Sequence, residues 1–195
     1  MKALQEIYPE RFFCRRHRMN WRAPVLVGAM REEFGPASVL DVGCATGDLV
    51  AEWLAQGVDA YGLEGSPAAL PYIEVDRDRM MVHDLRAPLH VRERVDLVTC
   101  FEVAEHIEPE HAGQFVANLA AAGDRLLVSC APPGQGGHYH VNCQPAAYWD
   151  ALFGAIGYRR ARASVVRLRA AWAPWAGKPG IKAIWQNLAY FERAA

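Results

Sequence analysis

One segment, residues 39–50, constrains the fold of this chain more than any other, and it reads VLDVGCATGDLV. An apolar run ends in an acid, passes through a turn that contains glycine, and resumes as an amphipathic segment. A buried parallel strand that turns tightly into a helix has this pattern. Gly43 and Gly47 permit backbone conformations that other residues resist, and they let a ligand approach the main chain closely. The segment therefore predicts a strand, a ligand-binding turn and a helix.

Strand-like and helix-like segments alternate along the rest of the chain. Apolar, β-branched segments that predict strands lie at 38–42, 58–63, 79–82, 95–100, 125–130, 158–164 and 184–191. Helical patterns lie at 17–33, 47–56, 67–73, 109–122 and 148–153. The alternation predicts an α/β fold, Rossmann-like and doubly wound, with a mostly parallel seven-stranded sheet and helices on both faces.

No internal repeat or linker divides the chain, so we expect residues 1–195 to form a single domain. Within it, residues 1–34 should form a helical lid over the ligand, and residues 35–164 should form the binding core. The stretch from 165 to 195 is rich in tryptophan, proline and glycine before its last apolar run. We expect it to be an insertion over the ligand cleft, followed by the last strand.

Composition narrows the class of protein. Apolar residues make up 52% of the chain, charged residues 22%, and the net charge is −1, as in an ordinary globular protein. No apolar run approaches the ~20 residues of a membrane span. Five cysteines without clustered spacing favour a reducing compartment. We therefore expect a cytoplasmic location and no membrane partner. The near-neutral charge weighs against a nucleic-acid partner, and the oligomeric state stays open.

Polar and glycine residues follow the predicted strands at the edge where ligands bind in parallel sheets. The five groups are residues 41–47, 64–66, 83–85, 101–102 and 131–137. Because the carboxyl ends of parallel strands meet at one edge of the sheet, we expect these residues to contact a single ligand. The last group, a glycine-rich loop, should carry residues 138–142 over the cleft.

The acids in these groups indicate which nucleotide-like ligand binds. Dinucleotide enzymes place a pyrophosphate on a helix N-terminus behind a G-x-G-x-x-G turn. Here the turn from Gly43 to Gly47 has the shorter spacing G-x-A-x-G, and Asp41 precedes it. A carboxylate there repels a pyrophosphate but accepts a hydrogen bond from an ammonium or ribose group. These residues favour S-adenosylmethionine, which has no phosphate and carries a positive sulfonium.

From about residue 35 to about residue 160 the chain resembles the class I S-adenosylmethionine-dependent methyltransferases. Residues 39–47 are similar to the family's first motif, with alanine in place of its middle glycine. Residues 61–64 resemble the second motif, 81–84 the third, and 95–106 the fourth motif with the helix that follows.

The resemblance implies that Glu64 bonds the ribose hydroxyls, that Asp84 receives the adenine amino group, and that Leu85 packs against the adenine ring. The cofactor-binding residues that we expect are Asp41, Gly43, Cys44, Ala45, Gly47, Glu64, Gly65, Ser66, His83, Asp84, Leu85 and Phe101. In the lid, an arginine or tyrosine should meet the methionine carboxylate, and the candidates are Tyr8, Arg16, Arg18 and Arg22.

Glu102, Glu105 and His106 form an E-x-x-E-H array at the expected start of a helix, where their spacing places them on one face. Such ligands, with His140 as a fourth, suit Mg²⁺ or Mn²⁺. The array is similar to that of metal-dependent O-methyltransferases, both ubiquinone-pathway enzymes and those acting on the terminal 2′-hydroxyl of small RNAs. The similarity implies that the metal lowers the pKa of the acceptor hydroxyl. The alternative has no metal: His140 or His106 is the general base, and Asn142 orients the acceptor.

The leading functional hypothesis is methyl transfer from S-adenosylmethionine to a hydroxyl of a small molecule or saccharide, which releases S-adenosylhomocysteine. The first alternative is a metal-dependent RNA 2′-O-methyltransferase, which the E-x-x-E-H array and the arginine clusters favour. The second is a non-catalytic cofactor-binding partner of a larger complex, which the acids and histidines near the expected methyl position oppose.

Overall fold

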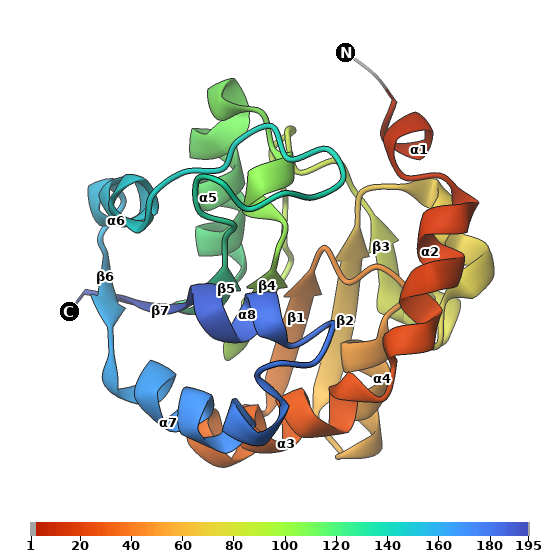
Figure 1. Ribbon diagram of the computed structural model, residues 1–195, viewed down its shortest axis with the longest axis horizontal. Helices are drawn as coiled ribbons and strands as arrows, with labels where there is room; N and C mark the ends of the chain where they lie inside the picture. The colour runs from red at the N-terminus through yellow and green to blue at the C-terminus, as the bar shows by residue number, and fades with distance from the viewer. Residues whose placement is uncertain (1–2, 195) are drawn as a thin grey trace.

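The central feature of the computed structural model, which describes residues 3–194, is one sheet of seven strands in the order β3-β2-β1-β4-β5-β7-β6 (Figure 1). The strands are β1 Ser38–Val42, β2 Asp59–Glu64, β3 Met80–Val82, β4 Leu97–Phe101, β5 Arg125–Ser129, β6 Tyr158–Ala161 and β7 Leu188–Arg193. The first five pair in parallel, but β7 runs antiparallel to both β5 and β6. The sheet is therefore mixed, and the expectation of an α/β fold with seven strands is confirmed.

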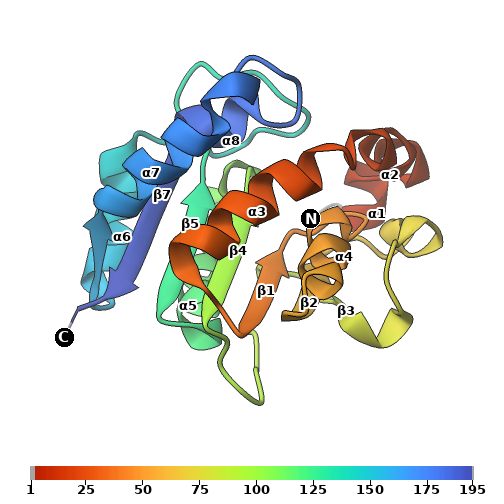
Figure 2. The ribbon, with the colours of Figure 1, turned by 90° about the horizontal axis from the view of Figure 1, so that it is seen from below.

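Helices cover both faces of the sheet. They are α1 Leu4–Ile7, α2 Glu10–Arg16, α3 Arg22–Phe34, α4 Asp48–Ala55, α5 Ala112–Ala122, α6 Ala146–Ala155, α7 Ala163–Trp172 and α8 Lys182–Asn187. One apolar core joins α3, α4, α7 and α8 to one face, and a second core joins α5 and α6 to the other. Figure 2 shows α3 and α7 side by side on the same face.

Alternation along each strand explains the two cores. In β1, Val39 belongs to the first core, whereas Leu40 and Val42 belong to the second, because successive side chains of a strand point to opposite faces. All five residues of β4 are buried, as the near-continuous apolar run of a central parallel strand predicts. Because β1, β2, β4 and β5 pair in parallel, their carboxyl ends lie at the same edge of the sheet, and so do the turns that follow them.

The N-terminal segment crosses the carboxyl ends of β1 and β2. Phe13 of α2 is buried against Ala45 and Ala69, and this small apolar cluster attaches the segment to the turn after β1 and to the 3₁₀ turn at 67–72. The hydroxyl of Ser66 also donates to the carbonyl of Tyr8 at 2.9 Å. Of the described residues before β1, the part that precedes α3 therefore lies over these strand ends (Figure 1), whereas α3 packs in the first core on one face of the sheet.

The C-terminal region corrects two expectations. Residues 163–172 form α7, whose Leu168 and Trp172 are fully buried in the core against α3, so the first part of the expected insertion belongs to the main fold. Residues 182–187 form helix α8, and the last strand begins only at Leu188. Ile181 and Ile184 explain the difference, because both are buried and apolar residues three positions apart share one face of a helix.

Among residues 3–194 the structure contains no helix with the length and apolar character that crossing a membrane requires.

Candidate functional site

A cavity of about 330 Å³ opens at the carboxyl ends of the parallel strands. The turn after β1, the end of β2 and the segments after β3 and β4 form its floor, and the loop after β5 forms one wall. Side chains of the N-terminal segment and Ala183 and Ile184 of α8 complete it. Strand ends that lie far apart in the sequence therefore share one binding site, as the positions of the polar residues predict.

The turn after β1 brings its backbone close to the cavity. Gly43 has φ +73°, and a Cβ there would lie 2.3 Å from a methyl group of Val103, so only glycine fits. Ala45 also adopts a left-handed conformation, with φ +53°. This conformation costs a non-glycine residue about 1 kcal/mol or more. The left-handed conformation at position 45 explains why the motif usually has glycine there. From the sequence, alanine at this position predicts only less space for the cofactor.

Two of the three acids at the strand ends line the cavity. The Glu64 carboxylate accepts hydrogen bonds from the backbone amides of Ser66 at 2.8 Å and Ala45 at 3.1 Å, and burial raises its pKa. Asp84 also lines the cavity, but Arg86 holds both of its oxygens. Partial burial acts to raise the pKa of Asp84, whereas the hydrogen bonds from Arg86 prevail and lower it.

Asp41 is the exception among the acids. It lies behind the turn, 4% exposed, and is absent from the cavity wall. The Thr99 hydroxyl donates to its carboxyl group at 2.6 Å. Burial raises the pKa of Asp41 to about 7, against the lowering effect of that hydrogen bond. Asp41 is therefore bonded to β4 in the interior of the sheet and lies outside the cavity.

Most of the remaining expected cofactor residues line the cavity. Those that do are Gly43, Ala45, Gly65, Ser66, Leu85 and Phe101. Cys44, Gly47 and His83 do not line it. The Cys44 thiol instead packs 3.6 Å from the sulfur of Met80, and the His83 ring lies 3.2 Å from the carbonyl of Ala87.

The E-x-x-E-H array is not one helical face. Glu102 has φ +55°, and the only helical structure among residues 102–106 is a single 3₁₀ turn at 104–106. The expectation that Glu102 joins Glu105 and His106 on one face is therefore wrong, because the chain bends at Glu102 before the turn begins. The structure instead gathers Glu105, His106 and His140, whose nearest ligand atoms all lie within 4.8 Å of one another.

Backbone carbonyls set the tautomer of both histidine rings in their neutral form. Nδ1 of His106 lies 3.1 Å from the carbonyl of Tyr139, and Nδ1 of His140 lies 3.0 Å from that of Gln135. A carbonyl only accepts hydrogen bonds, so each neutral ring carries its proton on Nδ1 and its lone pair on Nε2. Burial lowers the pKa of His106 to about 4, so its ring is neutral at physiological pH.

The Glu105 side chain is fully buried, and neither of its oxygens has a hydrogen-bond partner among the described residues. Burial and the nearby charge of Glu102 raise its pKa. Nε2 of His140 lies 3.9 Å from one of the Glu105 oxygens. A buried carboxylate without partners is costly, so this site favours a proton or a cation.

The lid contributes three of its four candidate residues to the cavity. Arg22 is paired with Asp48, with its Nε 2.9 Å from the carboxylate, whereas Arg18 is exposed and lies outside the cavity wall. Arg16 lines the cavity and makes no ion pair within residues 3–194. Burial, and secondarily Arg22, lowers its pKa to about 10, so it keeps its positive charge.

Tyr8 connects the lid to the histidines. Its ring meets those of His106 and His138 edge to face, each at a centroid distance of 5.7 Å. Its hydroxyl is buried and has no hydrogen-bond partner among residues 3–194, and burial raises its pKa. The hydroxyl is therefore available to a bound molecule.

Sequence reasoning missed three residues of this site. Arg86 holds Asp84, while Gln135 and Asn187 hold Glu102. Arginine and amide side chains in a loop or at a helix end have no distinctive sequence pattern. Of the three, only Gln135 could have been found from the sequence, because it is the one polar side chain within the glycine-rich loop that we expected to cover the cleft.

Comparison with known proteins shows the family to which the chain belongs. Residues 15–166 match the model of a family described as a methyltransferase domain. The ubiquinone biosynthesis O-methyltransferase of Alkalilimnicola ehrlichii is 32% identical over 126 residues, which are 60% of this chain and 47% of the relative. The chain thus spans about half the length of that relative.

Solved structures agree on the fold. Streptomyces venezuelae DesVI superposes with a TM-score of 0.66 at 15% identity, and 100% of each chain is covered. CalS10, an amino pentose methyltransferase from Micromonospora echinaspora solved with S-adenosylmethionine bound, superposes with a TM-score of 0.65 at 18% identity. That match covers 93% of this chain and 95% of CalS10.

Proposed function

The chain belongs to the methyltransferase-domain family of class I, S-adenosylmethionine-dependent enzymes, and we propose that it methylates a hydroxyl of a small molecule or saccharide. The observation that carries this proposal is the cluster of Glu105, His106 and His140 beside the cofactor cavity. Two nitrogen lone pairs and a buried carboxylate suit the removal of a proton from a hydroxyl. The identity to an O-methyltransferase over 126 residues supports an oxygen acceptor.

The charged residues that line the cavity suit S-adenosylmethionine. We assign Glu64 to the ribose hydroxyls and Asp84 to the adenine amino group, because both carboxylates line the cavity at adjacent strand ends. We assign Arg16 to the methionine carboxylate, because its half-buried positive charge lines the cavity and lacks an ionic partner among the described residues. Gly43 and Ala45 of the turn after β1 line the cavity, and we assign them to the methionine portion.

In the proposed reaction the acceptor oxygen attacks the methyl carbon in line with the bond to sulfur. A carbon–oxygen bond forms, the carbon–sulfur bond breaks with its electron pair going to sulfur, and Nε2 of His140 accepts the hydroxyl proton. His106, neutral because of its low pKa, contributes a second lone pair on Nε2. Tyr8 packs against His106 and keeps water from this side of the site.

The same cluster fits a divalent cation. Both Glu105 oxygens lack hydrogen-bond partners among residues 3–194, and each histidine presents Nε2 while a carbonyl holds Nδ1, as in many metal sites. Glu105, His106 and His140 would hold Mg²⁺ or Mn²⁺, and the ion would supply positive charge that lowers the pKa of the acceptor hydroxyl. Glu102 is not in this set.

The test of the hydroxyl proposal is turnover of S-adenosylmethionine by the purified chain with matched small acceptors that carry either a hydroxyl or an amine. We expect S-adenosylhomocysteine only with hydroxyl acceptors. His140→Ala should lower kcat by about 10²- to 10⁴-fold, the usual contribution of a general base, while the Kd of the cofactor stays unchanged. Glu110→Gln, an exposed acid on the next turn, is the matched control. Turnover with amines alone would overturn the proposal.

Metal use is tested separately. If a cation is held, titration of the apoprotein with Mn²⁺ should show one site by electron paramagnetic resonance, and Glu105→Gln should abolish it. Chelator should then lower kcat and added Mg²⁺ or Mn²⁺ should restore it. Unchanged turnover in chelator, together with no bound Mn²⁺, would reject the metal and leave His140 as the base.

A further inference from the structure

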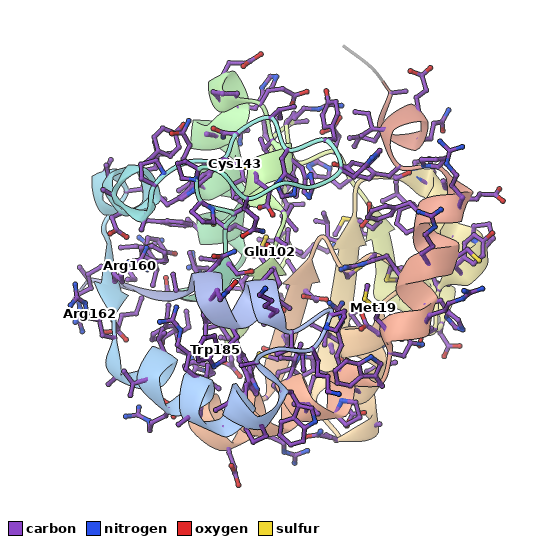
Figure 3. The ribbon with its side chains drawn as sticks, viewed as in Figure 1. Met19, Glu102, Cys143, Arg160, Arg162 and Trp185 are labelled. Carbon is purple, nitrogen blue, oxygen red and sulfur yellow. The ribbon has the colours of Figure 1, made fainter. Side chains whose placement is uncertain are left out.

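We propose that Asn187 and Gln135, through Glu102, form an amide clamp that positions His140 for the reaction. This inference rests on the proposed function of the cluster but concerns residues that touch neither Glu105 nor His106. It assigns Glu102 and Asn187 a positioning role. Figure 3 shows Glu102 between α8 and the loop that carries Cys143.

Three side chains from three elements make the clamp. Glu102, directly after β4, accepts hydrogen bonds from the amide of Gln135 at 2.7 Å and from the amide of Asn187 at 3.0 Å. The Asn187 amide also donates to the side-chain oxygen of Gln135 at 2.9 Å, which closes the triangle. Bonds to a carboxylate are stronger than those between neutral groups, so Glu102 is the centre of the clamp.

The clamp continues to the histidine through the backbone of Gln135. Nδ1 of His140 donates to the Gln135 carbonyl at 3.0 Å, and the Cys143 thiol lies 3.6 Å from the same oxygen. A Cβ on Gly137 would lie 2.0 Å from Nε2 of His140. The ring is therefore confined between the carbonyl of one loop residue and the backbone of another.

The loop has no strand or helix to fix this carbonyl. Residues 130–145 contain only turns and irregular backbone. Loops of this kind are more mobile than the elements they connect. Backbone bonds from Val141 and Asn142 to the Glu105 carbonyl hold the far end of the loop, and the side-chain bonds of Gln135 hold the near end. Asn187 is the last residue of α8, which packs in the core through Ile184, and it supplies a rigid anchor point.

The consequence is a defined tautomer. While the Gln135 carbonyl is in place, the proton of neutral His140 is held on Nδ1 and its lone pair faces Glu105 from Nε2. If the clamp is broken, the carbonyl is free to move and the ring can carry its proton on either nitrogen. The fraction of molecules with a competent Nε2 then falls, and kcat falls with it.

The test uses Asn187, because it lies outside the cavity wall and does not touch the histidines. Asn187→Ala removes both amide bonds, and Asn187→Asp is isosteric but places a second carboxylate against Glu102. We expect both variants to lower kcat about tenfold, with the cofactor Kd unchanged. Gln186→Ala, the neighbouring exposed amide on α8, is the matched control and should behave like the wild type.

A second readout does not depend on turnover. Two-bond ¹H–¹⁵N spectra of the apoprotein, at a pH where imidazole is neutral, report which ring nitrogen carries the proton. His140, identified with His140→Ala, should change from the Nδ1–H form to a mixture in both Asn187 variants. If the variants disturb folding, Gln135→Glu makes the same break within the loop. Wild-type His140 spectra in the folded variants would overturn the clamp, whereas absence of turnover in the wild type would overturn only the proposed function.

Discussion

At the scale of single residues, Asp41 shows how burial changes the chemistry of an acid. The residue lies beneath the cofactor turn and accepts a hydrogen bond from Thr99, and Arg16, Arg22 and Asp48 contribute to its electrostatic surroundings. Removal from water disfavours its charged form, which raises its pKa to about 7. The folded protein consequently holds a proton on Asp41 at a pH where an unfolded chain has lost it.

The first prediction concerns this proton. Between about pH 4 and pH 7 the folded state binds more protons at Asp41 than the unfolded state, so the contribution of Asp41 to the free energy of unfolding decreases as the pH rises through this window. Asp41→Asn cannot ionise and should lose that decrease. Relative to the wild type, its free energy of unfolding should rise by on the order of 2–4 kcal/mol between pH 4 and pH 8.

Urea denaturation at several pH values measures this difference. Asp78→Asn, an exposed acid of the same type, is the control and should follow the wild type. Parallel stability curves for Asp41→Asn and the wild type would contradict a raised pKa.

At the scale of elements, one carboxylate fastens the lid to the core. Glu74 receives hydrogen bonds from His17 at 3.2 Å and Asn20 at 2.5 Å, both in the lid, and from the Thr46 hydroxyl at 3.0 Å in the cofactor turn. The lid and the turn therefore share a fastening point. Opening the lid must break two of these three bonds.

Glu74→Gln tests the fastening. A glutamine retains one acceptor oxygen but loses the charge, so at least one charge-assisted bond, worth about 1.5–3 kcal/mol, is lost. We expect dissociation of S-adenosylhomocysteine to be about tenfold faster in stopped-flow measurements, and cleavage between residues 9 and 21 to be faster in limited proteolysis. Glu110→Gln serves as the control. An unchanged dissociation rate would show that the lid is held by its apolar contacts.

At the scale of the whole molecule, the C-terminal region completes the core. Trp172 on α7 is fully buried, and its indole nitrogen donates to the carbonyl of Val25 on α3 at 3.2 Å. The same helix pair leads to α8 and thus to Ala183 and Ile184 in the cavity wall. The packing of α3, α7 and α8 therefore contributes both to the stability of the protein and to the shape of the cavity.

Trp172→Ala should lower the free energy of unfolding by about 3–5 kcal/mol, because it removes a large buried side chain and leaves a cavity. Trp175→Ala, at a position 37% exposed, should change it by less than about 1 kcal/mol. Chemical denaturation followed by circular dichroism measures both. Equal effects of the two substitutions would indicate that α7 is a peripheral addition, as the sequence had suggested.

Features that depend on local sequence patterns could be predicted, whereas features that depend on contacts between distant residues could not. β1 was predicted at 38–42 and lies at Ser38–Val42, because its apolar run and the glycine turn are local signals. The start of β7 was placed too early because Ile184 and Trp185, which belong to α8, suit a strand as well as a helix. Among site residues, Glu64, Asp84 and His140 could be placed at the cavity from their positions after strands. The bend at Glu102 depends on φ +55°, a conformation that no residue pattern in this segment indicates.

By itself, the sequence determined the α/β class, the family motifs and the edge of the sheet where the cofactor cavity forms. These follow from hydrophobic periodicity and from residues next to strand ends, which are local properties of the chain. Only the tertiary structure decided that Asp41 lies beneath the cavity, that β7 runs antiparallel, and that Glu102 meets Gln135 and Asn187. Those side-chain contacts join residues 33 and 85 positions apart, and such contacts form only when the packed elements bring their side chains together.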